Sequence, residues 1–268
     1  MGSPEIDSGG RRGRRRANLS QDIASSLRDL IMSGEINVGT RLRVEQLARA
    51  FDVSLTPARE ALIALHGEGF LRLEARRGYI VAALSKRDLE DIFDLQAYIA
   101  GRLAGRAALA LSDAELDELD ALQRTIEDAH ERGDHQLIEE TNYRLHKMIN
   151  SVGESDKLSW MLRLLNRYVP YRFYGSVETW RNPDPDIHRS VLAGLRDRNP
   201  RQAEERMRAH IDVAGVALIE YLQSHGHFDA TNEHDGPTDP DDLAEKIESA
   251  MSRDAATPRL VRADPFNS

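Results

Sequence analysis

The sequence predicts a mainly α-helical protein in two parts: a small N-terminal domain of three helices with a two-stranded hairpin, and a larger all-helical bundle. Two patterns lead to this prediction. Apolar residues recur at helical spacing along most of the chain, and strand-like runs occur only between Phe70 and Ala83. We therefore divide the chain into a disordered basic arm, a first domain, a second domain and an acidic, mostly disordered tail, at residues 1–17, 18–84, 85–225 and 226–268.

The composition is that of a globular protein. Hydrophobic residues make up 40% and charged residues 30% of the chain, which is ordinary for this class. There is no cysteine, so disulfides and thiolate metal sites are excluded, and we expect a cytoplasmic location. No apolar stretch approaches the roughly 20 residues that a membrane span needs, and no signal-peptide core is recognisable. We expect no membrane association.

The net charge of −9 is unevenly distributed. Residues 1–85 carry 13 Arg against 10 acidic residues, a balance of +3, which leaves −12 for the remainder. A basic first part on an acidic body favours a polyanion as partner of the first part, although a polarised chain can also be simply well solvated. The arginine-rich arm allows the same two interpretations, extra phosphate contacts or a solubilising tail.

The first domain is expected to contain three helices and a hairpin. Apolar spacing predicts helices at 19–33 and 44–51. A third helix follows the turn at 52–54, with Thr56 as its N-cap and Pro57 near its first position. Two short strands then lie on either side of a hairpin tip formed by Arg76, Arg77 and Gly78.

Three helices, a tight turn and a two-stranded wing are typical of a winged helix-turn-helix, in which the third helix lies in the major groove of DNA. Arg59 is expected to read a base, because a guanidinium can bond both major-groove acceptors of guanine. Ser54 and Thr56 suit phosphate oxygens. The alternative is a winged helix used for protein contacts. The expected DNA-binding residues are Arg43, Ser54, Thr56, Arg59, Arg76, Arg77 and Gly78.

A known family shares the sequence of this domain at residues 27–34, 38–42, 45–48, 51–62, 69–71 and 77–81. On these residues, the segment of about 20–82 resembles the DNA-binding head of the GntR superfamily of transcriptional regulators. The resemblance implies a regulator, by expectation a repressor, that binds a palindromic operator on double-stranded DNA as a homodimer. Leu55 stands where the family usually has Arg, which removes a common DNA contact.

The second domain is expected to consist of helices alone. Ser112 and Glu115 form a capping-box pattern, and Pro200 stands where a first helical turn begins. Pro170 is expected to break or kink the fourth helix. The six predicted helices span 86–110, 113–132, 135–151, 155–169, 184–198 and 200–224.

Three short stretches of the second domain, at 142–146, 186–192 and 207–211, resemble the FCD effector domain of the FadR-like branch of the same superfamily. The resemblance implies a small-molecule effector and a divalent metal of the zinc or nickel class. The ligands that carry over are Asn142, His146, His188 and His210. Asn142 stands where the family usually has Asp, so the site either binds metal more weakly or serves as a polar pocket without it.

Helical spacing is compatible with this metal site. Asn142 and His146 lie four residues apart and therefore share a helix face. His188 and His210 lie on apolar stripes of two further helices. Neutral imidazoles from three helices suit zinc, nickel or similar ions. Taken one at a time, each histidine could equally be a satisfied core residue.

The effector is not expected to be a simple copy of the family's organic acids. Gln96 and Ala100 occupy the places where many FCD domains have Arg and Glu, so a larger or more apolar ligand becomes plausible. Arg163 and Arg167 could meet a carboxylate, or could lie on a solvated face. Aromatic residues that include Tyr171 could contact the ligand, or could belong to the core.

Two other function classes are compatible with parts of this sequence. Three histidines with a further coordination position can activate water, as in a metalloenzyme. No HExxH pattern, Gly-rich phosphate loop or nucleophile elbow accompanies them, so we expect no enzyme. An architectural DNA-binding protein without an effector is the other alternative.

Overall fold

The computed structural model describes residues 8–75, 78–152, 155–169, 177, 185–228, 244–247 and 249. The chain forms two compact units that divide between residues 83 and 84, and the described C-terminal residues 244–247 and 249 belong to the first of them. No helix among the described residues is long and apolar enough to cross a membrane.

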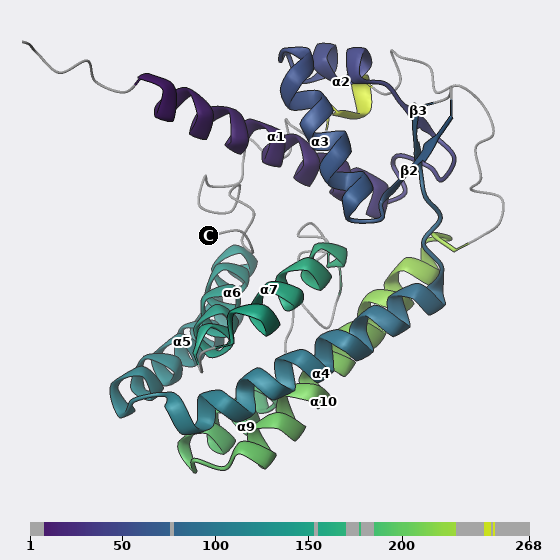
Figure 1. Ribbon diagram of the computed structural model, residues 1–268. Coiled ribbons are helices and arrows are strands. Elements are labelled where there is room, and N and C mark those ends of the chain that lie inside the picture. Colours follow the sequence, from purple (N-terminus) through teal and green to yellow (C-terminus); the bar gives the residue numbers. More distant parts are fainter. Residues whose placement is uncertain are drawn as a thin grey trace, which may run out of the picture. The chain divides into compact units, whose positions relative to one another are not determined.

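The first unit contains three helices and a small antiparallel sheet (Figure 1). The sheet has the order β1-β3-β2, with Arg41 opposite Ile80 and Leu71 opposite Val81. The two-residue strand β1 was not predicted, because so short a run shows no alternation. The elements are α1 (Ser8–Met32), β1 (Arg41–Leu42), α2 (Val44–Ala50), α3 (Leu55–Gly67), β2 (Leu71–Glu74) and β3 (Gly78–Val81).

A buried ion pair joins α1 to the end of α3. Nε and Nη2 of Arg28 donate to the same carboxylate oxygen of Glu68, at 3.1 and 2.9 Å. The Arg28 guanidinium also lies 5.8 Å from the centre of the Phe70 ring. Around this pair, Leu27, Leu47 and Leu62 from the three helices are fully buried. The core therefore fixes the orientation of α3, whose opposite face remains exposed.

The start of α3 differs from the prediction. The N-cap is Ser54, and Thr56 and Pro57 lie inside the first turn. Proline is tolerated there, because the first N–H groups of a helix have no intrahelical partner. The Ser54 side chain makes no capping hydrogen bond, so its hydroxyl remains available to an outside partner.

The two ends of the chain compare differently with expectation. The arm was predicted to be disordered over 1–17, but helix α1 begins at Ser8. The arginines and Ala17 favour a helix, and a helix already nucleated by the apolar stripe can extend into them, although Gly9, Gly10 and Gly13 each oppose it. Within the acidic tail, residues 244–247 are helical and Ile247 is fully buried, inside the stretch near 241–252 where the sequence predicts a weak helix.

The second unit is built from helices, and the first three have the predicted bounds. They begin at side-chain caps: Ser85 and Asp88 form one capping box, and Ser112 and Glu115 form another. Asn199 caps the last helix, which opens with Pro200. The elements are α4 (Lys86–Ala110), α5 (Asp113–Arg132), α6 (His135–Ser151), α7 (Asp156–Leu165), the 3-10 helix η1 (Asn166–Tyr168), α9 (Pro185–Arg196) and α10 (Pro200–Ser224).

Helices α4 and α10 run antiparallel along most of their length (Figure 1). Glycines allow their close approach: a Cβ at Gly215 would lie 2.6 Å from the Phe93 ring, and one at Gly105 would lie 2.9 Å from the Pro200 carbonyl oxygen. Helix α9 packs against both α5 and α10. This packing brings the inward faces of α6, α9 and α10 to one place in the core.

Candidate metal centre and DNA-contacting surface

Three histidines from three helices meet inside the second unit: His146 of α6, His188 of α9 and His210 of α10. One ring nitrogen from each lies within 4.8 Å of those of the other two. The ring centres of His188 and His210 are 4.7 Å apart, and those of His146 and His210 are 4.9 Å apart. We call this group the histidine triad. Its members are the three histidines that the sequence predicted as ligands.

All three imidazoles are neutral. Burial lowers the pKa of His146 to about 3 and that of His188 to about 4. Burial also lowers the pKa of His210 well below 6.5, and the other two histidines lower it further. A neutral imidazole keeps one nitrogen lone pair, which is the form that coordinates metal ions.

The ring of His188 is held on one side and unpartnered on the other. Its Nδ1 lies 3.1 Å from Oε1 of Gln123 on α5. Its Nε2 is buried and has no hydrogen-bond partner among the described residues. A buried polar atom without a partner is costly and calls for a ligand. The donor set therefore fits a metal ion.

The Nε2 atoms of His146 and His210 lie 2.9 Å apart, so without an ion the two neutral rings share a hydrogen bond. Two nitrogens bound to one tetrahedral ion at about 2.1 Å are about 3.4 Å apart. An ion would therefore replace this hydrogen bond with only a small outward movement of the two rings. Asn142 lies one helical turn before His146 and is partly buried. The structure thus provides three imidazoles that could hold a metal, with an amide on the same helix face.

The predicted effector residues do not form one group. Gln96 is buried, and its Nε2 donates to the carbonyl oxygen of Leu165 at 3.0 Å, so in this structure it joins α4 to α7. Arg163 of α7 and Arg167 of η1 are partly buried. Tyr171 lies outside the described residues, as do Arg76 and Arg77 of the wing tip.

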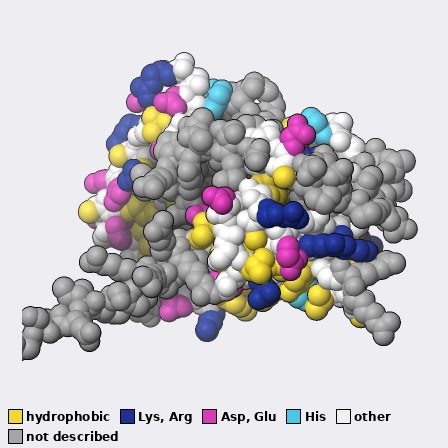
Figure 2. Space-filling model, turned by 90° about the horizontal axis from the view of Figure 1, so that it is seen from above, with side chains coloured by type: hydrophobic (Ala, Val, Ile, Leu, Met, Phe, Trp, Pro, Cys, Tyr) yellow, Lys and Arg dark blue, Asp and Glu magenta, His cyan; other side chains and the backbone are white. Residues whose placement is uncertain are grey.

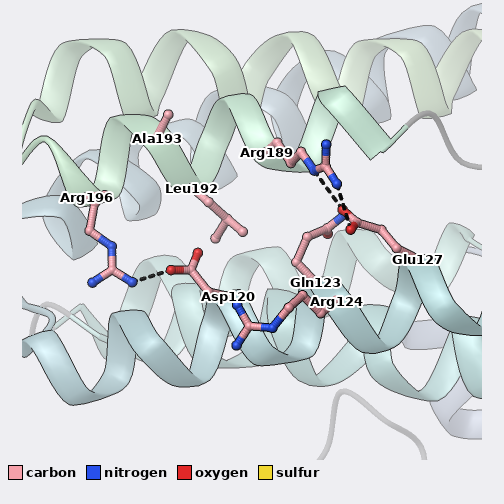
Figure 3. Close-up of a pocket in the computed structure, with 8 residues that line it drawn as sticks. All are labelled: Asp120, Gln123, Arg124, Glu127, Arg189, Leu192, Ala193 and Arg196. Carbon is pink, nitrogen blue, oxygen red and sulfur yellow. Dashed lines mark hydrogen bonds and ion pairs between the residues drawn. The ribbon is translucent and has the colours of Figure 1, made fainter.

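An open pocket of about 290 Å³ lies between α5 and α9 (Figure 3). Two arginines reach across it from α9: Arg189 pairs with Glu127, and Arg196 pairs with Asp120. Gln123 also lines this pocket and at the same time contacts the triad. Its position was not predicted. A polar residue on the apolar stripe of α5 is the signal that could have revealed it.

In the first unit, α3 presents a mixed surface. Leu55 and Ile63 are 45% and 52% exposed, and Ser54 and Arg59 lie exposed on the same side. Arg43 is exposed immediately before α2. The exposed arginines of this surface are therefore Arg43 and Arg59. Over the face of the molecule seen in Figure 2, basic side chains are interspersed with acidic and hydrophobic ones.

Without metal, the protein should lose stability as the pH falls from 6.5 toward about 4. The unfolded chain takes up protons on these histidines near 6.5, whereas the folded-state pKa is about 3 for His146 and about 4 for His188. Because the folded pKa values are the lower ones, this stability is fully present above pH 6.5 and is lost as the unfolded state binds protons.

Urea unfolding in the presence of a chelator, at a series of pH values, measures this effect. The loss per pH unit should be smaller for His146→Gln/His210→Gln than for the wild type. His135→Gln, at an exposed position at the start of α6, should keep the wild-type slope. Equal slopes for the wild type and the double variant would contradict the prediction.

Comparison with known proteins identifies both units. Residues 19–81 match the family of bacterial regulatory proteins called gntR, and residues 91–213 match the FCD domain. The HTH-type transcriptional regulator YdhC of Bacillus subtilis is 25% identical over 199 residues, which are 70% of this chain and 85% of that protein. The HTH-type transcriptional repressor GlaR of Escherichia coli is 26% identical over 69% of this chain and 89% of its own length.

A solved structure gives the same result for the fold. E. coli McbR/YncC matches with a TM-score of 0.58 at 24% identity, over 77% of this chain and 98% of that chain. The family and these relatives are DNA-binding transcriptional regulators and not enzymes. The chain belongs to the GntR family of transcriptional regulators and has an FCD domain.

Proposed function

We propose that this chain is a metal-containing repressor that binds a palindromic operator as a homodimer in the cytoplasm and responds to a small-molecule effector. The observation that supports this most is the convergence of three neutral imidazoles in the core of the FCD unit, with His188 Nε2 lacking a partner. Neither DNA binding by the first unit nor helix packing in the second requires three imidazoles that face one another.

In this proposal, His146, His188 and His210 hold a divalent ion of the zinc or nickel class, and Asn142 is the fourth ligand. When bound, the ion would act as a Lewis acid that accepts a lone pair from an oxygen atom of the effector. All four protein ligands are neutral, so the full positive charge of the ion remains to attract an anion. An acidic effector is therefore favoured, and the partly buried Arg163 and Arg167 are its proposed further contacts.

The proposed DNA contacts lie around the start of α3. Arg59 reads a base, while Ser54 and Thr56 bind phosphate oxygens together with the helix N-terminus. Arg43, Arg76, Arg77 and Gly78 are proposed to add contacts from outside α3. Leu55 is 45% exposed at the helix start. Such a side chain suits apolar contact with a thymine methyl group.

Two exposed apolar stripes support the proposed homodimer. Leu95 and Tyr98 lie exposed on α4, and Val213 and Val216 lie exposed on α10. Exposed apolar residues at helical spacing are typical of a surface that packs against another helix. Two DNA-binding units related by a two-fold axis would read a palindrome. Effector binding would change operator affinity only if it favours one conformation of the dimer over another.

Arg59→Ala should weaken binding to the DNA upstream of the protein's own gene by about 1–3 kcal/mol, because a bidentate contact to a base is lost. Arg106→Ala removes the same charge from an exposed position on α4 and should leave the affinity unchanged. Gel shift or fluorescence anisotropy at one salt concentration measures both. Absence of sequence-specific binding by the wild type, with and without metal, would count against a regulator of this kind.

Protein purified without chelator should contain about one zinc or nickel per chain, measured by elemental analysis. His146→Ala/His188→Ala should lose the metal, because two of the three imidazoles are removed. His135→Ala is the matched control, since this histidine lies exposed on the same helix as His146. A wild type without metal, or a double variant that retains it, would contradict the proposed centre.

A further inference from the structure

We propose that Gln123, Glu127 and Arg189 form a hydrogen-bonded chain that fixes the tautomer of His188 and leaves its Nε2 bare for a metal ion. Gln123 is thus a positioning residue of the metal centre. This inference rests on the proposed metal centre and assigns to three further residues a role in building it.

The chain begins at an ion pair on the surface of the α5–α9 pocket. Nε of Arg189 donates to Oε1 of Glu127 at 2.8 Å, and Nη2 donates to Oε2 at 2.7 Å (Figure 3). Both carboxylate oxygens are therefore engaged by one guanidinium. This two-point geometry fixes the plane of the Glu127 carboxylate more firmly than a single bond would.

The Glu127 carboxylate in turn determines which end of the Gln123 side-chain amide, the NH2 group or the oxygen, faces it. Nε2 of Gln123 lies 2.8 Å from Oε1 of Glu127. An ionised carboxylate only accepts hydrogen bonds, so the amide must present its NH2 group to Glu127. Its oxygen then faces the opposite way, toward His188, at 3.1 Å from Nδ1. Gln123 is 4% exposed, so water does not compete for these bonds.

The amide oxygen determines the tautomer of His188 by the same logic. An amide oxygen only accepts, so Nδ1 of His188 must carry the hydrogen. A neutral imidazole has one ring hydrogen, and Nε2 is therefore left with its lone pair. That atom is the one that is buried without a partner, beside His146 and His210.

A second ion pair in the same pocket provides a natural control. Arg196 pairs with Asp117 and Asp120, so it also joins α9 to α5. The structure shows no contact between this second pair and the triad. If Arg189 only held the two helices together, loss of Arg196 would have a similar effect. If Arg189 acts through Gln123, substitution of Arg189 should alter the tautomer of His188, and substitution of Arg196 should not.

Two readouts on the full chain test the inference. The 15N chemical shifts of histidine-labelled, metal-free protein report the tautomer of His188. Visible absorption during titration with Co²⁺ alone reports metal affinity. The wild type should show hydrogen on Nδ1. Gln123→Leu should lose this preference and bind Co²⁺ about 10–100-fold more weakly, the usual cost of losing an outer partner of a metal-bound histidine.

Arg189→Met should shift both readouts in the same direction but less, and Arg196→Met should leave them as in the wild type. Arg189 is 58% exposed, so its variant tests the chain even if Gln123→Leu does not fold. Hydrogen on Nε2 in the wild type, or an equal effect of the two arginine variants, would overturn the inference. Loss of the tautomer in Gln123→Leu without Co²⁺ binding by the wild type would support the chain and overturn the metal centre.

Discussion

The second unit depends on one constraint: three imidazoles share a desolvated position in its core and must all remain neutral. Burial lowers the pKa of each, and their proximity makes a second or third proton still less favourable. Neutral imidazoles can donate hydrogen bonds to one another, as His146 and His210 do. The Nε2 atom of His188 nevertheless has no hydrogen-bond partner among the described residues. A bound cation would resolve this conflict, because it would accept the lone pairs that point toward it.

Helix packing makes this meeting of side chains possible. His210 lies on α10, and α10 approaches α4 closely because Gly105 and Gly215 have no side chain at the contact. His188 lies on α9, which the arginine pairs fasten to α5. The triad is thus supported from several helices at once. Contacts from several helices favour a preorganised site, and preorganisation lowers the cost of binding a ligand.

Much of the fold could be predicted because the signals are local. The bounds of α4, α5 and α6 were correct, since caps such as Ser112 with Glu115 are encoded within four residues. The three histidines could be predicted as a set from helical stripes and the family resemblance. Gln123 could not, because its contact with His188 spans 65 residues. The two-residue strand β1 forms only because β3 offers it a partner.

The most direct test is to identify the atoms that coordinate a bound zinc ion. X-ray absorption of the zinc-loaded full chain should show nitrogen or oxygen neighbours at about 2.0–2.1 Å, with the outer-shell scattering of three imidazole rings. That result would place the ion in the histidine triad. A first shell with a single imidazole, or with none, would contradict the claim that the three histidines of the triad form a metal centre.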